Sequence, residues 1–237
     1  MKRHLNTRLL QAISFALILF CAMPAAARNW LFKNGKSDYR IVLDRQASPS
    51  EKKAAEELQM YIKQISGAEL PITGNEQEKG KKIIIGFGEK AAAVTGQEAP
   101  EADYEGYTCR TVGKDLLIYG GAQRGSMYGV FSFLEDELGV KWLTPKCTVV
   151  PSMQKYALPR LDRSEKPALA LRYDGYFAVE REPVWSAHNK ENMKWTPTQN
   201  DYGNIEAYWT ASTTRFRWGL MSSRQVSGAM KRLLPSP

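Results

Sequence analysis

The stretch RIVLDRQASPSEKKAAEELQMYIKQISG, residues 40–67, decides the fold because it predicts a strand followed by a capped helix. The apolar run Arg40–Leu43 is typical of a strand. Ser48 is suited to cap the helix, Pro49 fits its first position, and Glu51 completes a capping box. Apolar residues then recur at helical spacing and predict one buried face. They are Ala54, Ala55, Leu58, Tyr61, Ile62 and Ile65.

The sequence that follows supplies the other elements of one small domain. Lys82–Gly86 is a continuous apolar run, which predicts a strand covered on both faces. Gly106–Val112 and Leu116–Tyr119, joined by a glycine-containing turn, predict a β-hairpin. Arg124–Leu138 has one apolar face and predicts a second helix. Short strands are also expected at Leu70–Ile72, Trp142–Leu143 and Thr148–Val150. This order predicts an α+β fold over residues 28–158, a small mixed β-sheet with two helices packed on one face.

The excess of positive charge lies at the two ends of the chain. The 237 residues contain 33 Lys and Arg against 25 Asp and Glu, a net charge of +8. Residues 1–27 carry three of the basic residues and residues 210–237 carry five, and neither segment holds an acid. Residues 28–209 balance 25 basic against 25 acidic residues. The charge therefore gives no reason to expect nucleic acid as a partner.

Residues 1–27 are typical of a secretory signal peptide. Basic residues precede an apolar stretch, and Ala25–Ala27 supply the small residues expected before cleavage at Arg28. A membrane helix is the alternative, but the apolar run is shorter than the roughly 20 residues that span a bilayer. Cys21 would suit a lipoprotein, which the bulky Phe20 before it disfavours. We expect an exported protein, periplasmic or extracellular, with no membrane span after cleavage.

The tail of residues 210–237 lacks clear hydrophobic periodicity, and we expect it to be disordered. Two origins fit this anomalous basic composition. The tail is either a flexible chain end or the product of a reading frame lost near Thr210.

Two cysteines and one histidine remain after the expected cleavage. Cys109 and Cys147 can form a disulfide in an exported protein. Cys109 also fits the alternative of a small buried hydrophobe within a strand. With His188 as the remaining histidine, a zinc site or a Ser-His-Asp triad has little support. We therefore expect no metal and no cofactor.

Three stretches together resemble the N-terminal domain that precedes the barrel in secreted bacterial glycoside hydrolases. They are IVLDRQASPSEKKAAEELQMYIKQISGAELPI, IIIGFGEK and GYTCRTVGKDLLIYGGAQRGSMYGVFSFLEDELGVKWLTP. The domain is similar to that of α-glucuronidases and β-N-acetylhexosaminidases, over about residues 38–175. The resemblance implies a hexosaminidase N-terminal-domain-like fold and the start of an incomplete (β/α)8 barrel at residues 168–209. Between them, residues 159–167, PRLDRSEKP, are polar and flanked by prolines, which predicts a linker. The resemblance also implies a glycan substrate, bound through a barrel that is missing from this chain.

The most specific part of the resemblance is a glycine-rich turn into the second predicted helix. Its residues are Gly120, Gly121, Arg124, Gly125, Tyr128 and Gly129. The glycines allow a sharp turn and close backbone approach, and Arg124 is placed to pair with an acid or a carbonyl. An anion site at the helix start is the alternative. Since no Lys-Ser/Thr pair follows, the structural interpretation is favoured.

The first barrel strand implied by the resemblance would end at Arg172, Tyr173 and Asp174. Barrel active sites lie at the carboxyl ends of the strands, so these residues are the candidates for sugar binding. Arg172 suits a forked contact to a hydroxyl or carboxylate. The alternatives are a structural ion pair for Arg172 and a turn at Asp174. Residues 173–209 are rich in aromatic rings, which suit either sugars or a core.

Hydrolysis of a glycosidic bond usually needs two flanking carboxylates. A complete barrel takes about 250 residues, and too few follow Ala168 to supply one. Asp174, Glu180 and Glu182 do not form a credible catalytic pair, so no catalytic residue is assigned. We expect an accessory domain that supports a barrel and is inactive alone. The alternatives are a stand-alone carbohydrate-binding or surface-interaction module, and a hydrolase completed by another chain.

Overall fold

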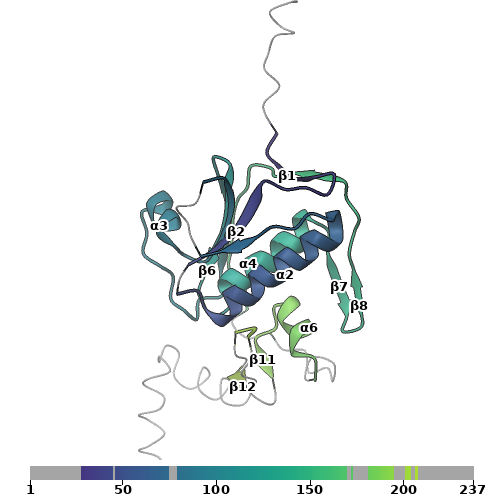
Figure 1. The fold of residues 1–237 in the computed structure, drawn as a ribbon. Coiled ribbons are helices and arrows are strands. Elements are labelled where there is room, and N and C mark those ends of the chain that lie inside the picture. Colours follow the sequence, from purple (N-terminus) through teal and green to yellow (C-terminus); the bar gives the residue numbers. More distant parts are fainter. Residues whose placement is uncertain are drawn as a thin grey trace, which may run out of the picture.

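The computed structural model describes most of the chain between residues 28 and 207 (Figure 1). The described residues are 28–44, 46–74, 79–169, 172, 181–194, 201–203 and 206–207. The expected signal peptide, the tail, Tyr173 and Asp174 lie outside them. Among the described residues, no helix combines the length and apolar character that crossing a membrane requires.

The first long helix, α2 (Pro49–Ser66), forms as its sequence predicts. The Ser48 side chain accepts a hydrogen bond from the backbone of Glu51, whose side chain accepts one from the backbone of Ser48. Gly67 ends the helix in the left-handed region, with φ of 77°. All six residues of the expected apolar face are buried. Local capping and periodicity therefore suffice to define this helix.

A six-stranded mixed sheet forms the centre of the domain, in the order β10-β5-β6-β4-β2-β3. The neighbours β3, β2, β4 and β6 are parallel, while β6–β5 and β5–β10 are antiparallel pairs. The strands are β2 (Tyr39–Leu43), β3 (Ile72–Thr73), β4 (Lys81–Ile85), β5 (Tyr107–Val112), β6 (Asp115–Gly120) and β10 (Asp162–Glu165). The predicted α+β class with a mixed sheet is confirmed.

Helices cover both faces of this sheet. Figure 1 shows α2 and α4 (Gly125–Ser132) side by side on one face, above the main core, and α3 (Glu89–Thr95) on the other. Leu117 and Tyr119 of β6 pack with Ala91 of α3, whereas the alternate residues of β6 face the main core. In the neighbouring β4, consecutive residues Ile83, Ile84 and Ile85 are all buried, so its predicted burial on both faces is correct. The sequence analysis missed α3, because its short alanine run has no clear apolar stripe.

The second predicted helix, Arg124–Leu138, forms with a change of geometry. The α-helix α4 continues into a π-helical turn, η1 (Phe133–Glu137), and Gly139 follows with φ of 75°. The sequence predicted one uninterrupted helix. Its apolar face is buried throughout, so the core continues across the π-turn.

The segment 159–167, for which the sequence predicted a linker, contains β10 and belongs to the sheet. This strand pairs with β5 along its whole length, and the Thr108 and Ser164 hydroxyls lie 2.8 Å apart across the pair. β10 is an exposed edge strand of polar residues, DRSE. It therefore lacks the apolar alternation that would predict a strand from sequence.

Two strand pairs and a short helix complete the described structure. Strand β1 (Trp30–Lys33) pairs with β9 (Lys155–Ala157), and β7 (Lys141–Thr144) forms a hairpin with β8 (Cys147–Val149). After the sheet, α6 (Pro183–His188) is followed by the parallel pair of β11 (Met193–Lys194) and β12 (Glu206–Ala207). Figure 1 places α6, β11 and β12 beside one end of α2 and α4.

Cys109 and Cys147, which the sequence left open as a possible disulfide, are both free cysteines in the structure. Cys109 is buried in β5, where burial raises the pKa of its thiol to about 12. Cys147 is exposed in β8. The alternative interpretation of Cys109 as a small buried hydrophobe holds.

Candidate functional site

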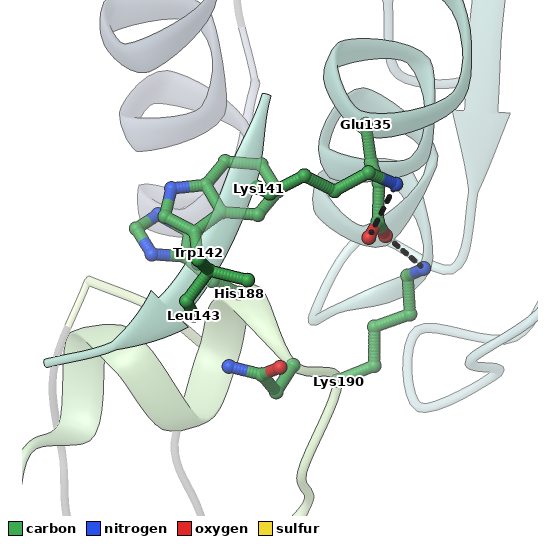
Figure 2. A pocket seen from close by; sticks show the side chains of 7 residues that line it. Glu135, Lys141, Trp142, Leu143, His188 and Lys190 are labelled. Carbon is green, nitrogen blue, oxygen red and sulfur yellow. Dashed lines mark hydrogen bonds and ion pairs between the residues drawn. The ribbon is translucent and has the colours of Figure 1, made fainter. Parts of the chain in front are cut away.

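The candidate site is a pocket of about 340 Å³ between β7, η1 and the end of α6 (Figure 2). Two segments that are distant in sequence contribute to its walls, one at residues 135–143 and the other at residues 188–190. The lining residues are Glu135, Lys141, Trp142, Leu143, His188, Asn189 and Lys190.

Trp142 forms a fixed aromatic wall of the pocket. Its Nε1–H donates to the Tyr61 hydroxyl at 2.8 Å, which holds the indole against α2. The His188 ring stacks on it with centroids 4.4 Å apart and an interplanar angle of 14°. Phe131 meets His188 edge-on, with centroids 4.7 Å apart. The rings are therefore positioned by packing before any ligand arrives.

The opposite wall of the pocket is charged. Lys141 Nζ lies 3.2 Å from one carboxylate oxygen of Glu135, and Lys190 Nζ lies 3.9 Å from the other, as the dashed lines of Figure 2 show. These three side chains carry a combined charge of +1. Glu135 is the one carboxylate among the described residues that line the pocket. Among the described residues that line the pocket, no second carboxylate therefore faces Glu135.

Behind the pocket, a buried carboxylate joins α2 to the segment after the sheet. Glu57 Oε2 lies 2.6 Å from His188 Nε2, and the Tyr202 hydroxyl donates to the other oxygen of Glu57. Burial, together with the hydrogen bond to Glu57, raises the pKa of Tyr202 far above its usual value. Because both carboxylate oxygens are occupied and the group is buried, the arrangement is suited to holding the segment in place.

The sequence analysis missed this contact although a signal was present. Glu57 lies on the apolar face of α2, between Ala54 and Leu58, where a carboxylate needs a partner when buried. His188 stands out in the sequence only as the one histidine after residue 27, and no local pattern connects it to Glu57.

Arg172 takes part in a second polar cluster, formed by Glu105, Arg124, Arg172 and Asn192. The Arg172 guanidinium lies 2.7 Å from Glu105 Oε2, and Arg124 Nε lies 2.6 Å from Oε1. Asn192 donates to both oxygens of Glu105, at 3.1 and 2.9 Å. Arg172 also donates to the carbonyl oxygens of Lys190 and Leu169. This is the ion pair considered as the alternative to sugar binding, while Tyr173 and Asp174 lie outside the described residues.

The glycine-rich turn before α4 provides space for a neighbouring loop. A Cβ on Gly121 would lie 2.1 Å from the Tyr104 carbonyl oxygen, and one on Gly125 would lie 2.5 Å from that of Gly106. Gly120 and Gly129 are also crowded. An added Cβ would lie 2.3 Å from the Gly106 carbonyl oxygen at Gly120, and 2.7 Å from the Ile118 side chain at Gly129.

Two larger side chains of the same motif point to protein partners. Arg124 pairs with Glu105, and the Tyr128 hydroxyl donates to the Glu191 carbonyl at 3.3 Å. The Arg172 guanidinium lies 5.7 Å from the centre of the Tyr128 ring. This geometry matches the structural interpretation of the motif. In the described parts of the chain, no three His, Cys, Asp or Glu side chains lie together so that they could hold a metal ion.

Comparison with known proteins relates the domain to one family. Residues 32–133, from β1 into η1, match the model described as Glycosyl hydrolase family 67 N-terminus. A protein named Probable alpha-glucuronidase A from Neosartorya fischeri is 32% identical over 83 residues, which are 34% of this chain and 10% of that protein. Its namesake from Aspergillus fumigatus is 30% identical with the same coverage. The chain thus matches about 10% of the length of these curated relatives.

A solved structure supports the fold assignment. It is titled as a family GH115 4-O-methyl-α-glucuronidase with specificity for decorated arabinogalactans. It superposes with a TM-score of 0.52 and 14% identity, over 69% of this chain and 25% of the other. The chain therefore shares its fold with this structure, and residues 32–133 are similar to the N-terminal domain of family 67 glycoside hydrolases, in line with the resemblance that the sequence indicated.

Proposed function

We propose that this chain acts as an exported, non-catalytic N-terminal domain of an α-glucuronidase-type glycoside hydrolase, and that it packs against a catalytic (β/α)8 barrel and stabilises it. The observation that carries the proposal is the match of residues 32–133 to the family 67 N-terminal domain. The match includes α2, α4 and most of the sheet, which are the elements that form the core. The relatives are far longer than the matched part, which leaves room for a separate catalytic domain.

The carboxylates of the described residues support an absence of hydrolysis by this chain alone. Glu135 is bound by two lysines at the pocket, Glu57 is buried beneath His188, and Glu105 is bound by two arginines. A general acid and its partner carboxylate must instead face a sugar from two sides. None of these three groups faces a second carboxylate across the pocket.

Enzyme assays with the full chain test this proposal. We expect the chain to release no more chromophore from a chromogenic α-glucuronide than an unrelated control protein does at equal concentration. We also expect a separately produced barrel domain of an α-glucuronidase to gain thermal stability when the chain is added. Turnover of the glucuronide by the chain alone, lost on heat denaturation, would contradict the accessory role.

Export is the second part of the proposal, and it is supported by the basic, apolar and small-residue order of residues 1–27. We expect the product recovered from the periplasm or medium to begin at Arg28, as determined by N-terminal sequencing. A chain that keeps Met1 and remains in the cytoplasmic fraction would overturn this part.

A carbohydrate-binding role is the second candidate function. It is favoured by one observation, the pocket beside Trp142 with its charged wall. Binding without turnover is compatible with a supporting domain, because neither role requires hydrolysis.

A further inference from the structure

We propose that the pocket between β7, η1 and α6 binds a sugar acid, as a free uronic acid or a chain end, with its carboxylate against Lys141 and Lys190. The choice of a uronic acid over other small carboxylates rests on the proposed function. The pocket itself is independent of the family match, because all its lining residues follow residue 133.

The size of the pocket suits one sugar ring. Its volume of about 340 Å³ lies at the lower end of the range of roughly 300–1,000 Å³ for small-molecule sites. Walls from β7, η1 and the turn after α6 surround it on several sides (Figure 2). A single ring with polar substituents is therefore a better fit than an extended oligosaccharide.

The charges favour an anion that also carries hydroxyl groups. Each lysine ammonium has three N–H donors. Lys141 uses one of them in its hydrogen bond to Glu135, whereas Lys190, at 3.9 Å, contacts Glu135 as an ion pair. The remaining donors are available to an incoming carboxylate, and the excess of one positive charge favours it. Glu135 can accept hydrogen bonds from ring hydroxyls while it holds both lysines in place. A neutral sugar would make the hydroxyl contacts with Glu135 but not the charge-assisted hydrogen bonds between a carboxylate and the two lysines.

The apolar part of the pocket provides contact for C–H groups of a sugar. His188 stacks on one face of Trp142 and each of the two residues is 7% exposed, so Leu143, which is 58% exposed, offers the larger apolar surface to a ligand. Because the Tyr61 hydrogen bond fixes the indole, little side-chain ordering accompanies binding. A polar wall opposite an apolar wall suits a carbohydrate ring, which carries both hydroxyl and C–H groups.

Saturation-transfer NMR and calorimetric titration of the full chain test the proposal with three probes: sodium D-glucuronate, D-glucose and sodium acetate. We expect saturable binding of glucuronate, with glucose and acetate each at least about tenfold weaker. Binding should weaken as salt rises, because the lysines are partly exposed, at 48% and 30% of their side chains. Equal binding of glucose and glucuronate, or no binding of glucuronate, would overturn the assignment.

Substitution of the two lysines locates the site. Lys141→Gln with Lys190→Gln should weaken glucuronate binding at least about tenfold. The control is Lys52→Gln with Lys63→Gln, which removes the same charge from exposed positions of α2 and should leave binding unchanged. Unchanged binding in the pocket variant, or an equal loss in both, would refute the site. These outcomes leave the accessory role standing, whereas hydrolysis of a glucuronide by the chain would overturn that role and not the binding.

Discussion

The carboxylate of Glu57 in α2 and the imidazole of His188 in α6 lie 2.6 Å apart, although 131 residues separate them in the sequence. Both side chains are buried, with 5% of Glu57 and 7% of His188 exposed. The pair therefore fixes the segment around α6 against the helix that the sequence defines best. The position of His188 in turn sets the ring that stacks on Trp142 at the pocket.

Glu57→Ala tests the energetic importance of this contact. The substitution leaves the His188 ring and the Tyr202 hydroxyl buried without their acceptor, which costs about 2–4 kcal/mol of unfolding free energy. Urea denaturation measures the loss. Glu56→Ala is the matched control, because Glu56 is 61% exposed and forms a surface pair with Lys53, which contributes about 0–1 kcal/mol. Equal effects of the two substitutions would contradict a buried anchoring role.

Arg172→Ala separates the two interpretations of Arg172. Because its guanidinium bonds to Glu105 and to two backbone carbonyls, we expect a loss of about 1–3 kcal/mol in stability. Glucuronate affinity per folded molecule should fall far less than in Lys141→Gln with Lys190→Gln, because Arg172 reaches the pocket only through the Lys190 carbonyl. Urea denaturation and calorimetric titration measure the two quantities. Lost affinity with full stability would instead place Arg172 in a sugar site.

The sequence predicted those elements whose signals are local. Capping and periodicity define α2, and a glycine turn between apolar runs defines the β5–β6 hairpin. Strand β10 was missed because its residues are polar and its pairing with β5 spans about 50 residues of sequence. The pocket was missed for a related reason, since Trp142 and His188 meet only through the folding of separate segments. Glu57 on an apolar face was the one local sign of that contact.

Thiol reactivity distinguishes the two described cysteines. Burial disfavours the charged thiolate of Cys109 and raises its pKa to about 12, so its reactive form stays scarce until the pH approaches that value. In the chain beginning at Arg28, we expect Cys147 to react with a disulfide reagent at pH 8 at least about a hundredfold faster than Cys109. In denaturant, both should react fast. If no thiol reacts in denaturant until a reductant is added, the two cysteines instead form a disulfide.

Gly121→Ala tests the structural interpretation of the glycine-rich turn. The added methyl group would lie 2.1 Å from the Tyr104 carbonyl oxygen, a backbone atom that cannot move without shifting its loop. We expect a loss of about 1–3 kcal/mol or more, measured by urea denaturation. Gly74→Ala is the control, because its methyl group would meet its nearest neighbour, the Leu43 carbonyl oxygen, at an ordinary 4.0 Å. If the turn served as an anion site instead, Gly121→Ala would preserve stability and abolish binding of phosphate. The structural interpretation predicts lost stability and no phosphate binding before or after the substitution. Stability and phosphate binding, measured on this pair of variants, therefore decide between the two interpretations.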